Sequence, residues 1–277
     1  MPLTPEQQAE IDQQRATPRQ TLRAVADGIE RHLYLAHPVL DHGFVRVIDY
    51  MGDDAAIVQA ARVSYGAGTR KVSNDEGLIF VARQWIRHRT ANVNEYSARY
   101  SILDREFYTP APEHLAAQSD VNNQGRGATL EGAEAARVLD ILKGDAARAY
   151  DHYEEMLSTE GKQGLARELA RMNLPASIYT QWYWKTDLHN LFHFLHLRAD
   201  AHAQYEIRVY AETIARLVAD WVPLAWGAYQ DYRMGGTQLS RQAIDCLRRM
   251  LKGEKVTQET SGMSAREWRE FEGVMRE

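Results

Sequence analysis

Residues 84–101 read QWIRHRTANVNEYSARYS, and the rest of the chain can be interpreted around this stretch. Its basic side chains are Arg87, His88, Arg89 and Arg99. One carboxylate, that of Glu95, accompanies them. Arginine suits phosphate and carboxylate groups because its planar guanidinium donates two parallel hydrogen bonds. Since the apolar run FVARQW overlaps the start of the stretch, we expect an anion site at the edge of a hydrophobic core. A charged face exposed to solvent is the alternative that composition leaves open.

The composition argues against disorder and against general nucleic-acid binding. The chain has 277 residues, 44% of them hydrophobic, which is enough for a sizeable core in one large domain or two small ones. Its formal net charge is −5, whereas nucleic-acid binding usually requires a basic surface. A local basic pocket for a small anion remains compatible with this charge, and we expect no nucleic-acid partner.

Cysteine content and hydropathy indicate a cytoplasmic protein. The only cysteine, Cys246, has apolar neighbours and cannot form an intrachain disulfide, so a reducing compartment is the simplest setting. No segment reaches the roughly 20 apolar residues that span a bilayer. The N-terminal sequence MPLTPEQQAEIDQQR also lacks the apolar core of a signal peptide. We therefore expect no membrane partner.

The first part of the chain alternates between strand and helix patterns. Residues 43–52 alternate apolar and polar side chains, which predicts a half-buried strand. The two aspartates that follow can cap a helix over 55–63. Residues 64–77 are rich in glycine and small polar side chains, which predicts a loop. The apolar spacing in 78–88 favours a helix that ends in the basic cluster.

The second part is predicted to be mainly helical. Residues 118–132 form a polar, Gly- and Asn-rich loop and are the best candidate for disorder. The β-branched and aromatic run SIYTQWYW, residues 177–184, predicts a strand. Asp187 then caps the helical stretch LHNLFHFLHLR, and a long amphipathic stretch follows. The chain closes with two helices, the second of which starts with the capping-box sequence SARE at Ser264.

Histidines on the helix after Asp187 raise the alternative of a metal site. His189, His193 and His196 lie at i, i+4 and i+7, on one helix face. Histidines four residues apart bind zinc in some hydrolases, and a catalytic zinc usually has three protein ligands. A metal-dependent hydrolase on this helix is therefore one interpretation, and histidines hydrogen-bonded around a pocket are the other.

The basic stretch resembles the signature of the flavin-dependent thymidylate synthases, the ThyX family. RHRTANVNEYSARYS contains the signature order of Arg-His-Arg, seven residues and then Ser. ARVSYG, EFYTP, LARELARMNLP, YTQWYW and LHNLFHFLHLRADAHAQYEIRVYA also resemble that family in its usual order. The resemblance covers roughly residues 43–230, and a match of this length carries a low false-positive risk.

The resemblance implies a fold and a reaction. The fold would be α/β (α+β), with a central, mainly antiparallel twisted sheet flanked by helices. A polar helical extension would occupy 1–36, the catalytic domain 37–234 and a helical extension 235–277. The enzyme would methylate dUMP reductively to dTMP, with 5,10-methylenetetrahydrofolate as the carbon donor. FADH2, regenerated by NADPH, would be the reductant, and the active sites would be shared within a homotetramer.

The resemblance also implies site residues. Arg198 would be catalytic, stabilising negative charge as uracil N3 ionises. The dUMP site would comprise Gln84, Arg87, Glu95, Ser97, Ala98, Arg99, Arg171 and Arg198. The FAD site would comprise Ser64, Arg87, His88, Arg89, Asn94, Glu95, Asp187, His189 and His193. Those assignments would account for the histidine helix without a metal. Ser97 could instead be a nucleophile, but no dedicated base is evident, so phosphate binding is our prediction for it.

One departure from the family pattern bears on the flavin. Between Ile79 and Phe80, members carry a helix, a segment whose His, Thr and Glu help to hold flavin, and a strand. Here GLI joins FVARQW directly. Either the protein lacks this segment or the sequence omits it. A true loss would expose unpaired strand edges, so the intact flanks favour an omission. A non-catalytic homologue that keeps nucleotide binding is a further alternative.

Overall fold

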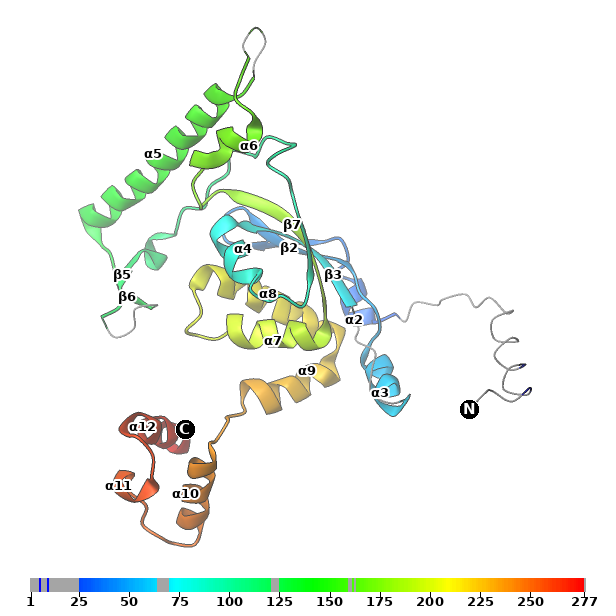
Figure 1. Ribbon diagram of the computed structural model, residues 1–277, viewed down its shortest axis with the longest axis vertical. Helices are drawn as coiled ribbons and strands as arrows, with labels where there is room; N and C mark the ends of the chain where they lie inside the picture. Colours follow the sequence, from blue (N-terminus) through cyan, green and yellow to red (C-terminus); the bar gives the residue numbers. More distant parts are fainter. Residues whose placement is uncertain are drawn as a thin grey trace. The chain divides into compact units, whose positions relative to one another are not determined.

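The computed structural model describes residues 25–63, 70–120, 125–158 and 163–276 and the isolated positions 5, 9 and 161, without the side chains of 59–63 and 70–77. The chain divides into two units, Met1–Pro223 and Leu224–Glu277, and each is described by itself. Figure 1 labels the elements of both units.

An antiparallel five-stranded sheet forms the centre of the first unit. Its strands, in spatial order, are β1 (Ala36–Val39), β2 (Gly43–Asp49), β3 (Arg70–Leu78), β7 (Tyr179–Asp187) and β4 (Asn92–Glu95). Every neighbouring pair is antiparallel. The strand β4 belongs to the basic stretch and lies at one edge of this sheet, beside β7.

The alternation of side chains along β7 explains why this strand is central. Thr180, Trp182, Trp184 and Thr186 are buried on one face, while the residues between them are more exposed. Period-two burial of this kind is what a strand with one core-facing side requires. The large aromatic side chains of β7 therefore face the helices of the first unit.

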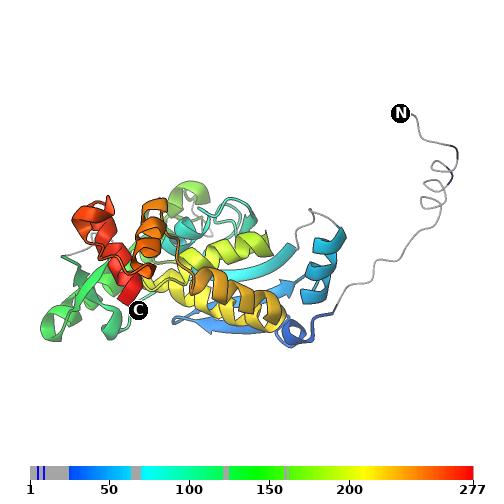
Figure 2. The same cartoon turned by 90° about the horizontal axis from the view of Figure 1, so that it is seen from below.

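Three helices pack near that aromatic face. They are α4 (Ile79–Trp85), α7 (Leu188–Arg198) and α8 (Tyr205–Trp221). The fully buried Trp85 ring lies 5.5 and 5.3 Å from the rings of Trp182 and Trp184, and 4.6 Å from Phe194 of α7. Figures 1 and 2 show α7 and α8 side by side along the sheet. Because Trp85 is the last residue of α4, this packing fixes the basic cluster that follows it.

The remaining elements of the first unit are shorter, with one exception. They are α2 (Asp27–Glu30), α3 (Asp54–Val63), η1 (Pro112–His114), β5 (Ala116–Gln118), β6 (Arg126–Thr129), α5 (Gly132–Met156), α6 (Arg167–Ala170) and η2 (Arg171–Asn173). The strands β5 and β6 pair as a separate two-stranded sheet. The long helix α5 contributes Tyr150 and Tyr153 to a second hydrophobic cluster with Leu103 and Ile178.

The second unit is helical and has its own core. Its elements are α9 (Pro223–Tyr229), which begins at the boundary, η3 (Gln230–Met234), α10 (Arg241–Leu251), α11 (Gln258–Ser261) and α12 (Ala265–Arg276). The core consists of Ala243, Cys246, Val256, Met263 and Phe271. Ser264 and Glu267 exchange hydrogen bonds at the start of α12, so the predicted capping box is confirmed.

Two loop predictions were wrong. Within 64–77, which was expected to be a loop, residues 70–77 belong to β3 and pair with β2 and β7. Residues 118–132 were the best candidate for disorder, yet this segment contains β6, which pairs with β5. For β3, ladder hydrogen bonds to the distant strand β7 outweigh a turn-like composition, whereas β6 pairs with the neighbouring strand β5.

Several expectations were confirmed. The described part of the chain mixes helices with antiparallel sheets, and the predicted strands over 43–52 and 177–184 correspond to β2 and β7. Asp53 accepts a hydrogen bond from the Ala56 N–H at the start of α3. Asp187 caps α7 as predicted. None of the helices described is long and apolar enough to cross a membrane.

Candidate functional site

Arg198 is joined to the end of α4 by two hydrogen bonds. Its Nε donates to His88 Nε2 at 3.1 Å, and one terminal nitrogen donates to the Gln84 carbonyl oxygen at 3.3 Å. Arg198 is the last residue of α7, so the two contacts tie the C-terminal ends of two helices together. The guanidinium is half-buried and held in one orientation.

His88 is a neutral acceptor in this arrangement. Burial, then the charge of Arg198, then that of His193, lower the pKa of His88 from 6.5 to about 4. A neutral imidazole can accept at Nε2 only when the proton is on Nδ1, and the bond from Arg198 selects that tautomer. At neutral pH, Arg198 therefore carries the charge of this pair.

A cationic cavity of about 270 Å³ opens beside this pair. It is lined by Arg87, His88, Arg89, Thr90, Thr186, Asn190, His193, Leu197 and Arg198. Three of these residues are arginines and none carries a carboxylate. A cavity with this set of donors attracts an anion, because no acidic side chain in its lining neutralises the guanidinium groups.

Asp187 supports this cavity indirectly, through Asn190. Its carboxylate accepts the Asn190 N–H at 2.9 Å and the Asn190 side-chain amide at 2.7 Å. Asn190 lines the cavity, whereas Asp187 is not among the lining residues. The predicted flavin residue Asp187 therefore acts first as the N-cap of α7, with Asn190 between it and the cavity.

A second, larger cavity of about 540 Å³ lies next to β4 and η2. The predicted nucleotide residues that line it are Glu95, Ser97, Ala98 and Arg171. Other lining residues, which sequence reasoning missed, include Arg83, Tyr96, Glu168 and Thr180. Thr180 donates to Glu95 at 2.9 Å, which fixes that carboxylate. Thr180 lies on the buried face of β7, so the strand alternation was the available signal.

Ser97 begins a tight turn at this cavity. Its Oγ accepts the Arg99 N–H at 3.3 Å, and its carbonyl accepts the N–H groups of Tyr100 and Ser101, each at 3.0 Å. No histidine is among the described residues that line the cavity. The setting suits a hydroxyl that binds an anion better than one activated as a nucleophile.

Arg99 does not line either of these cavities. Its guanidinium pairs with Glu168 at 3.1 Å, and both side chains are about half exposed. Gln84 likewise lines neither cavity; its side chain donates to Gln204.

Two predicted flavin residues that the structure describes, Asn94 and His189, do not line the cationic cavity. Asn94 lies on β4 opposite Tyr183 and is exposed, and His189 is exposed on α7. Ser64 lies outside the described residues.

The histidine helix is not arranged as a metal centre. His189, His193 and His196 are all exposed. Among the residues that the structure describes, no three His, Cys, Asp or Glu side chains are grouped so that they could hold a metal ion. The metal-dependent hydrolase therefore has no geometric support from this helix.

Comparison with known proteins gives a consistent result. Residues 75–224 match the family model described as thymidylate synthase complementing protein. A protein of Ruegeria pomeroyi named flavin-dependent thymidylate synthase is 71% identical over 300 aligned positions, covering 99% of each chain. One of the same name from Gluconobacter oxydans is 55% identical, again covering 99% of each.

Solved structures that resemble this chain include a UMP/dUMP methylase, PolB, from Streptomyces cacaoi bound with 5-Br UMP. The TM-score is 0.62 at 27% sequence identity, and the match covers 71% of this chain and 97% of that one. The same methylase bound with 5-Br dUMP gives a TM-score of 0.61.

The alignment lengths reveal a gap in this chain. The match to the Ruegeria protein extends over 300 positions, whereas this chain has 277 residues. At least 300 − 277 = 23 of those positions are therefore filled in the relative and empty here.

Proposed function

Since the chain belongs to the flavin-dependent thymidylate synthase family, we propose that it methylates dUMP to dTMP, with 5,10-methylenetetrahydrofolate as the carbon donor. FAD, reduced by NADPH, is the proposed redox cofactor. The observation that carries the proposal is the cationic cavity, with its three arginines and no carboxylate, beside the fixed guanidinium of Arg198.

The nucleotide occupies the larger cavity in this proposal. Arg171 and Arg83 supply positive charge there, and the Ser97 turn offers a hydroxyl for the phosphate. Glu95, held by Thr180, is an acceptor for a sugar hydroxyl or a base N–H. Arg99 reaches the phosphate by exchanging its exposed partner Glu168 for the ligand, which costs little because exposed ion pairs are weak.

The cationic cavity fits part of a flavin dinucleotide. Its donor set suits the diphosphate, with Arg87 and Arg89 as the binding cations and Asn190 and His193 beside them. When bound, the flavin supplies the hydride chemistry that the side chains cannot. The contribution of the chain is to orient the ligands and to place the charge of Arg198 where uracil N3 becomes negative.

The oligomeric state, the cellular location and the domain boundaries are also part of the proposal. We propose a cytoplasmic homotetramer in which several subunits complete each site, since one chain presents only part of the predicted flavin set around its cavity. We also propose that residues 1–36 and 235–277 are extensions of a catalytic domain over 37–234.

A tritium-release assay tests the reaction. Purified protein is incubated with dUMP labelled at C5, FAD, NADPH and methylenetetrahydrofolate, and dTMP is measured in parallel by chromatography. We expect tritium release and dTMP formation that depend on every component. A colourless protein that binds no added FAD and releases no tritium would overturn the proposal.

A non-catalytic homologue is the second candidate, and the alignment gap favours it. If the missing positions include flavin contacts, the chain keeps nucleotide binding and loses FAD. Calorimetry with dUMP and FAD, titrated separately, distinguishes the two candidates. Binding of both supports the enzyme, and binding of dUMP alone supports the homologue.

A further inference from the structure

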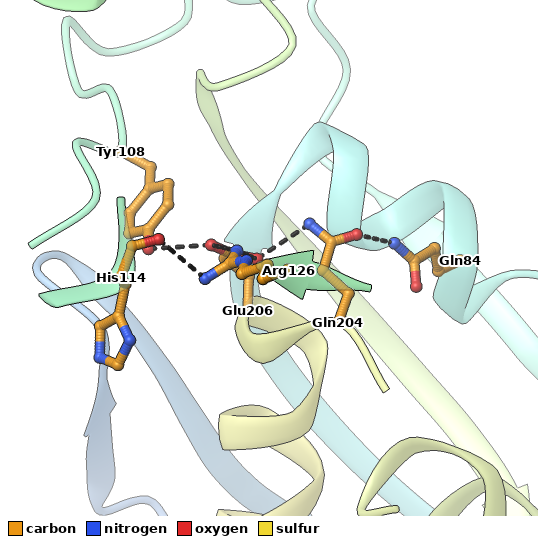
Figure 3. Close-up of polar contacts among 6 residues, drawn as sticks. All are labelled: Gln84, Tyr108, His114, Arg126, Gln204 and Glu206. Atoms are coloured by element: carbon orange, nitrogen blue, oxygen red, sulfur yellow. Dashed lines mark hydrogen bonds and ion pairs between the residues drawn. The ribbon is translucent and has the colours of Figure 1, made fainter. Parts of the chain in front are cut away.

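A buried carboxylate near the start of α8 lies outside the machinery described so far. The side chain of Glu206 is only 2% exposed. It accepts two hydrogen bonds from one nitrogen of Arg126, at 2.5 and 2.7 Å, and one from the Tyr108 hydroxyl at 3.1 Å. Gln204 donates to it at 2.9 Å. Figure 3 shows these side chains converging on Glu206.

The carboxylate is ionised at neutral pH. Burial by itself raises the pKa of Glu206, but the hydrogen bonds from Arg126 and Gln204 outweigh burial and hold that pKa below its usual value. Burial and the nearby carboxylate raise the pKa of the Tyr108 hydroxyl, so Tyr108 keeps its proton and donates. Arg126 comes from β6, so the β5–β6 hairpin supplies the cation that neutralises Glu206.

An ionised carboxylate can only accept hydrogen bonds, and this fixes the orientation of two amides in turn. Gln204 must present its NH2 group to Glu206, which leaves its carbonyl oxygen facing Gln84. Gln84 donates its own NH2 group to that oxygen. The carbonyl oxygen of the Gln84 side chain is consequently left as an acceptor.

Gln84 is the residue on which two networks meet. Its side chain ends the series that starts at Glu206, and its backbone oxygen accepts from Arg198. It lies in the last turn of α4, directly before the buried Trp85. A change in the orientation of Gln84 therefore displaces an acceptor of the Arg198 guanidinium.

We propose that Gln204 and Glu206 are positioning residues, which hold the Gln84 carboxamide and thereby keep the Gln84 backbone oxygen in place as an acceptor for Arg198, the guanidinium that the proposed function puts beside the uracil. This inference rests on the proposed function only for the identity of the ligand. The contacts among the three side chains are present without a ligand. The proposal adds Gln204 and Glu206 to the residues that determine affinity for the nucleotide.

The central variant is Gln204→Met, which keeps the length of the side chain. It removes the two hydrogen bonds that link Glu206 to Gln84 through Gln204, which we call the relay. Gln118→Met is the matched control, because the Gln118 side chain donates to the Gly125 carbonyl within the β5–β6 hairpin and not to Glu206, Gln204 or Gln84. Glu206→Gln is a second variant, in which a neutral amide can present either its oxygen or its NH2 group to Gln204. All three proteins are studied as full-length chains.

The first readout is dUMP binding, together with the split between KM and kcat. A net hydrogen bond contributes about 1 kcal/mol, so we expect Gln204→Met to raise the dissociation constant and KM for dUMP roughly 5- to 10-fold. We expect kcat to fall as well, because Arg198 loses its fixed position, and Gln118→Met to match the wild type. Unchanged dUMP affinity in Gln204→Met would overturn the proposed positioning role.

The second readout needs no ligand and separates this inference from the proposed function. Hydrogen exchange over residues 84–90 is measured by mass spectrometry in the free proteins. We expect exchange there to be faster in Gln204→Met than in the wild type or Gln118→Met. If the wild type fails to bind dUMP, the proposed function fails, and this readout still decides the relay: exchange equal to wild type overturns it.

Discussion

The proposed role of Arg198 depends on two acceptors that hold its guanidinium, one in α4 and one in the basic cluster that follows α4. His88 Nε2 and the Gln84 carbonyl oxygen fix the guanidinium, so its charge requires no reorganisation when an anion forms nearby. Removing one such preorganised donor typically costs about 10²- to 10³-fold in rate. This magnitude exceeds what loss of an ordinary surface arginine produces.

We expect Arg198→Ala to lower dTMP formation by at least about 10²-fold while the circular dichroism spectrum stays unchanged. Arg208→Ala is the control. Arg208 lies on the next helix, α8, donates to the Ala201 carbonyl and lines neither of the two cavities. Turnover near the wild-type rate in Arg198→Ala would show that the assigned role is wrong.

The lowered pKa of His88 predicts how the stability of the fold depends on pH. Its folded-state pKa of about 4 lies below the ordinary value of 6.5, so on acidification the unfolded chain takes up the proton first. The contribution of His88 to stability is therefore present above pH 6.5 and is lost as pH falls from 6.5 to 4. Urea unfolding at pH 7.5 and pH 5 measures this difference.

We expect the wild type to lose more unfolding free energy between these two pH values than His88→Gln, whose side chain does not titrate. His202→Gln is the control, since the His202 side chain is 88% exposed. Equal pH dependence in the wild type and His88→Gln would contradict the neutral state of the half-buried His88.

At the scale of elements, variants of Asp187 can distinguish a helix-capping role from a ligand-binding role. Its two bonds to Asn190 start α7, the helix that ends at Arg198. We expect Asp187→Ala to cost about 1 kcal/mol in unfolding free energy, and Asp187→Asn to cost much less, because asparagine also caps helices. Chemical denaturation measures both.

The flavin affinity of the same variants then decides how Asp187 acts. If Asp187 acts through the cap and Asn190, Asp187→Asn keeps FAD affinity near that of the wild type. A large loss of FAD affinity in Asp187→Asn, without a loss of stability, would instead indicate a direct contact of the carboxylate with the cofactor.

Elements with a strong local signal could be predicted from the sequence, and elements defined by distant partners could not. The β-branched and aromatic composition of residues 177–184 and the cap at Asp187 are local features, and both predictions are confirmed. The strand β3 has a polar sequence, and only its pairing with β2 and β7 makes it a strand. Local composition carries no information about that pairing.

The candidate site shows the same limit. The resemblance supplied Arg87, His88, Arg89 and Arg198, which the structure brings to one cavity. The partner of Gln84 is 120 residues away in sequence, and the buried carboxylate behind it belongs to a helix of mixed polarity. Such contacts follow from packing, so no spacing rule along the chain could have revealed them.

At the scale of the whole molecule, the second unit is expected to unfold separately from the first. Phe271 is 4% exposed in a core made only of residues from Leu224–Glu277. Truncating a buried phenylalanine to alanine typically costs about 3–5 kcal/mol. We expect Phe271→Ala to lower one calorimetric transition and to leave dUMP binding unchanged.

Val274→Ala provides the control on the same helix, because that side chain is 38% exposed. A single transition that shifts as a whole in Phe271→Ala would contradict the independence of the second unit.

The gap in the alignment bears on the whole sheet. The strand β3 ends at Leu78 and α4 begins at Ile79, without any connecting residue. In that sheet, β3 lies between β2 and β7. A central strand of an antiparallel sheet usually carries apolar residues at alternate positions, yet the sequence of β3 is RKVSNDEGL. The family pattern carries a further strand directly before the FVARQW helix. We infer that the missing segment supplies the strand that belongs next to α4.

Intact-mass measurement of the protein purified from its native source tests this inference. We expect a mass above 31.6 kDa by at least the mass of 23 residues, because an apolar strand in the centre of the sheet and a complete flavin site both require the segment. A mass of 31.6 kDa would contradict the expectation. In that case β3 is the native central strand, and weak FAD binding follows, since the flavin contacts expected from the segment are then absent from the protein.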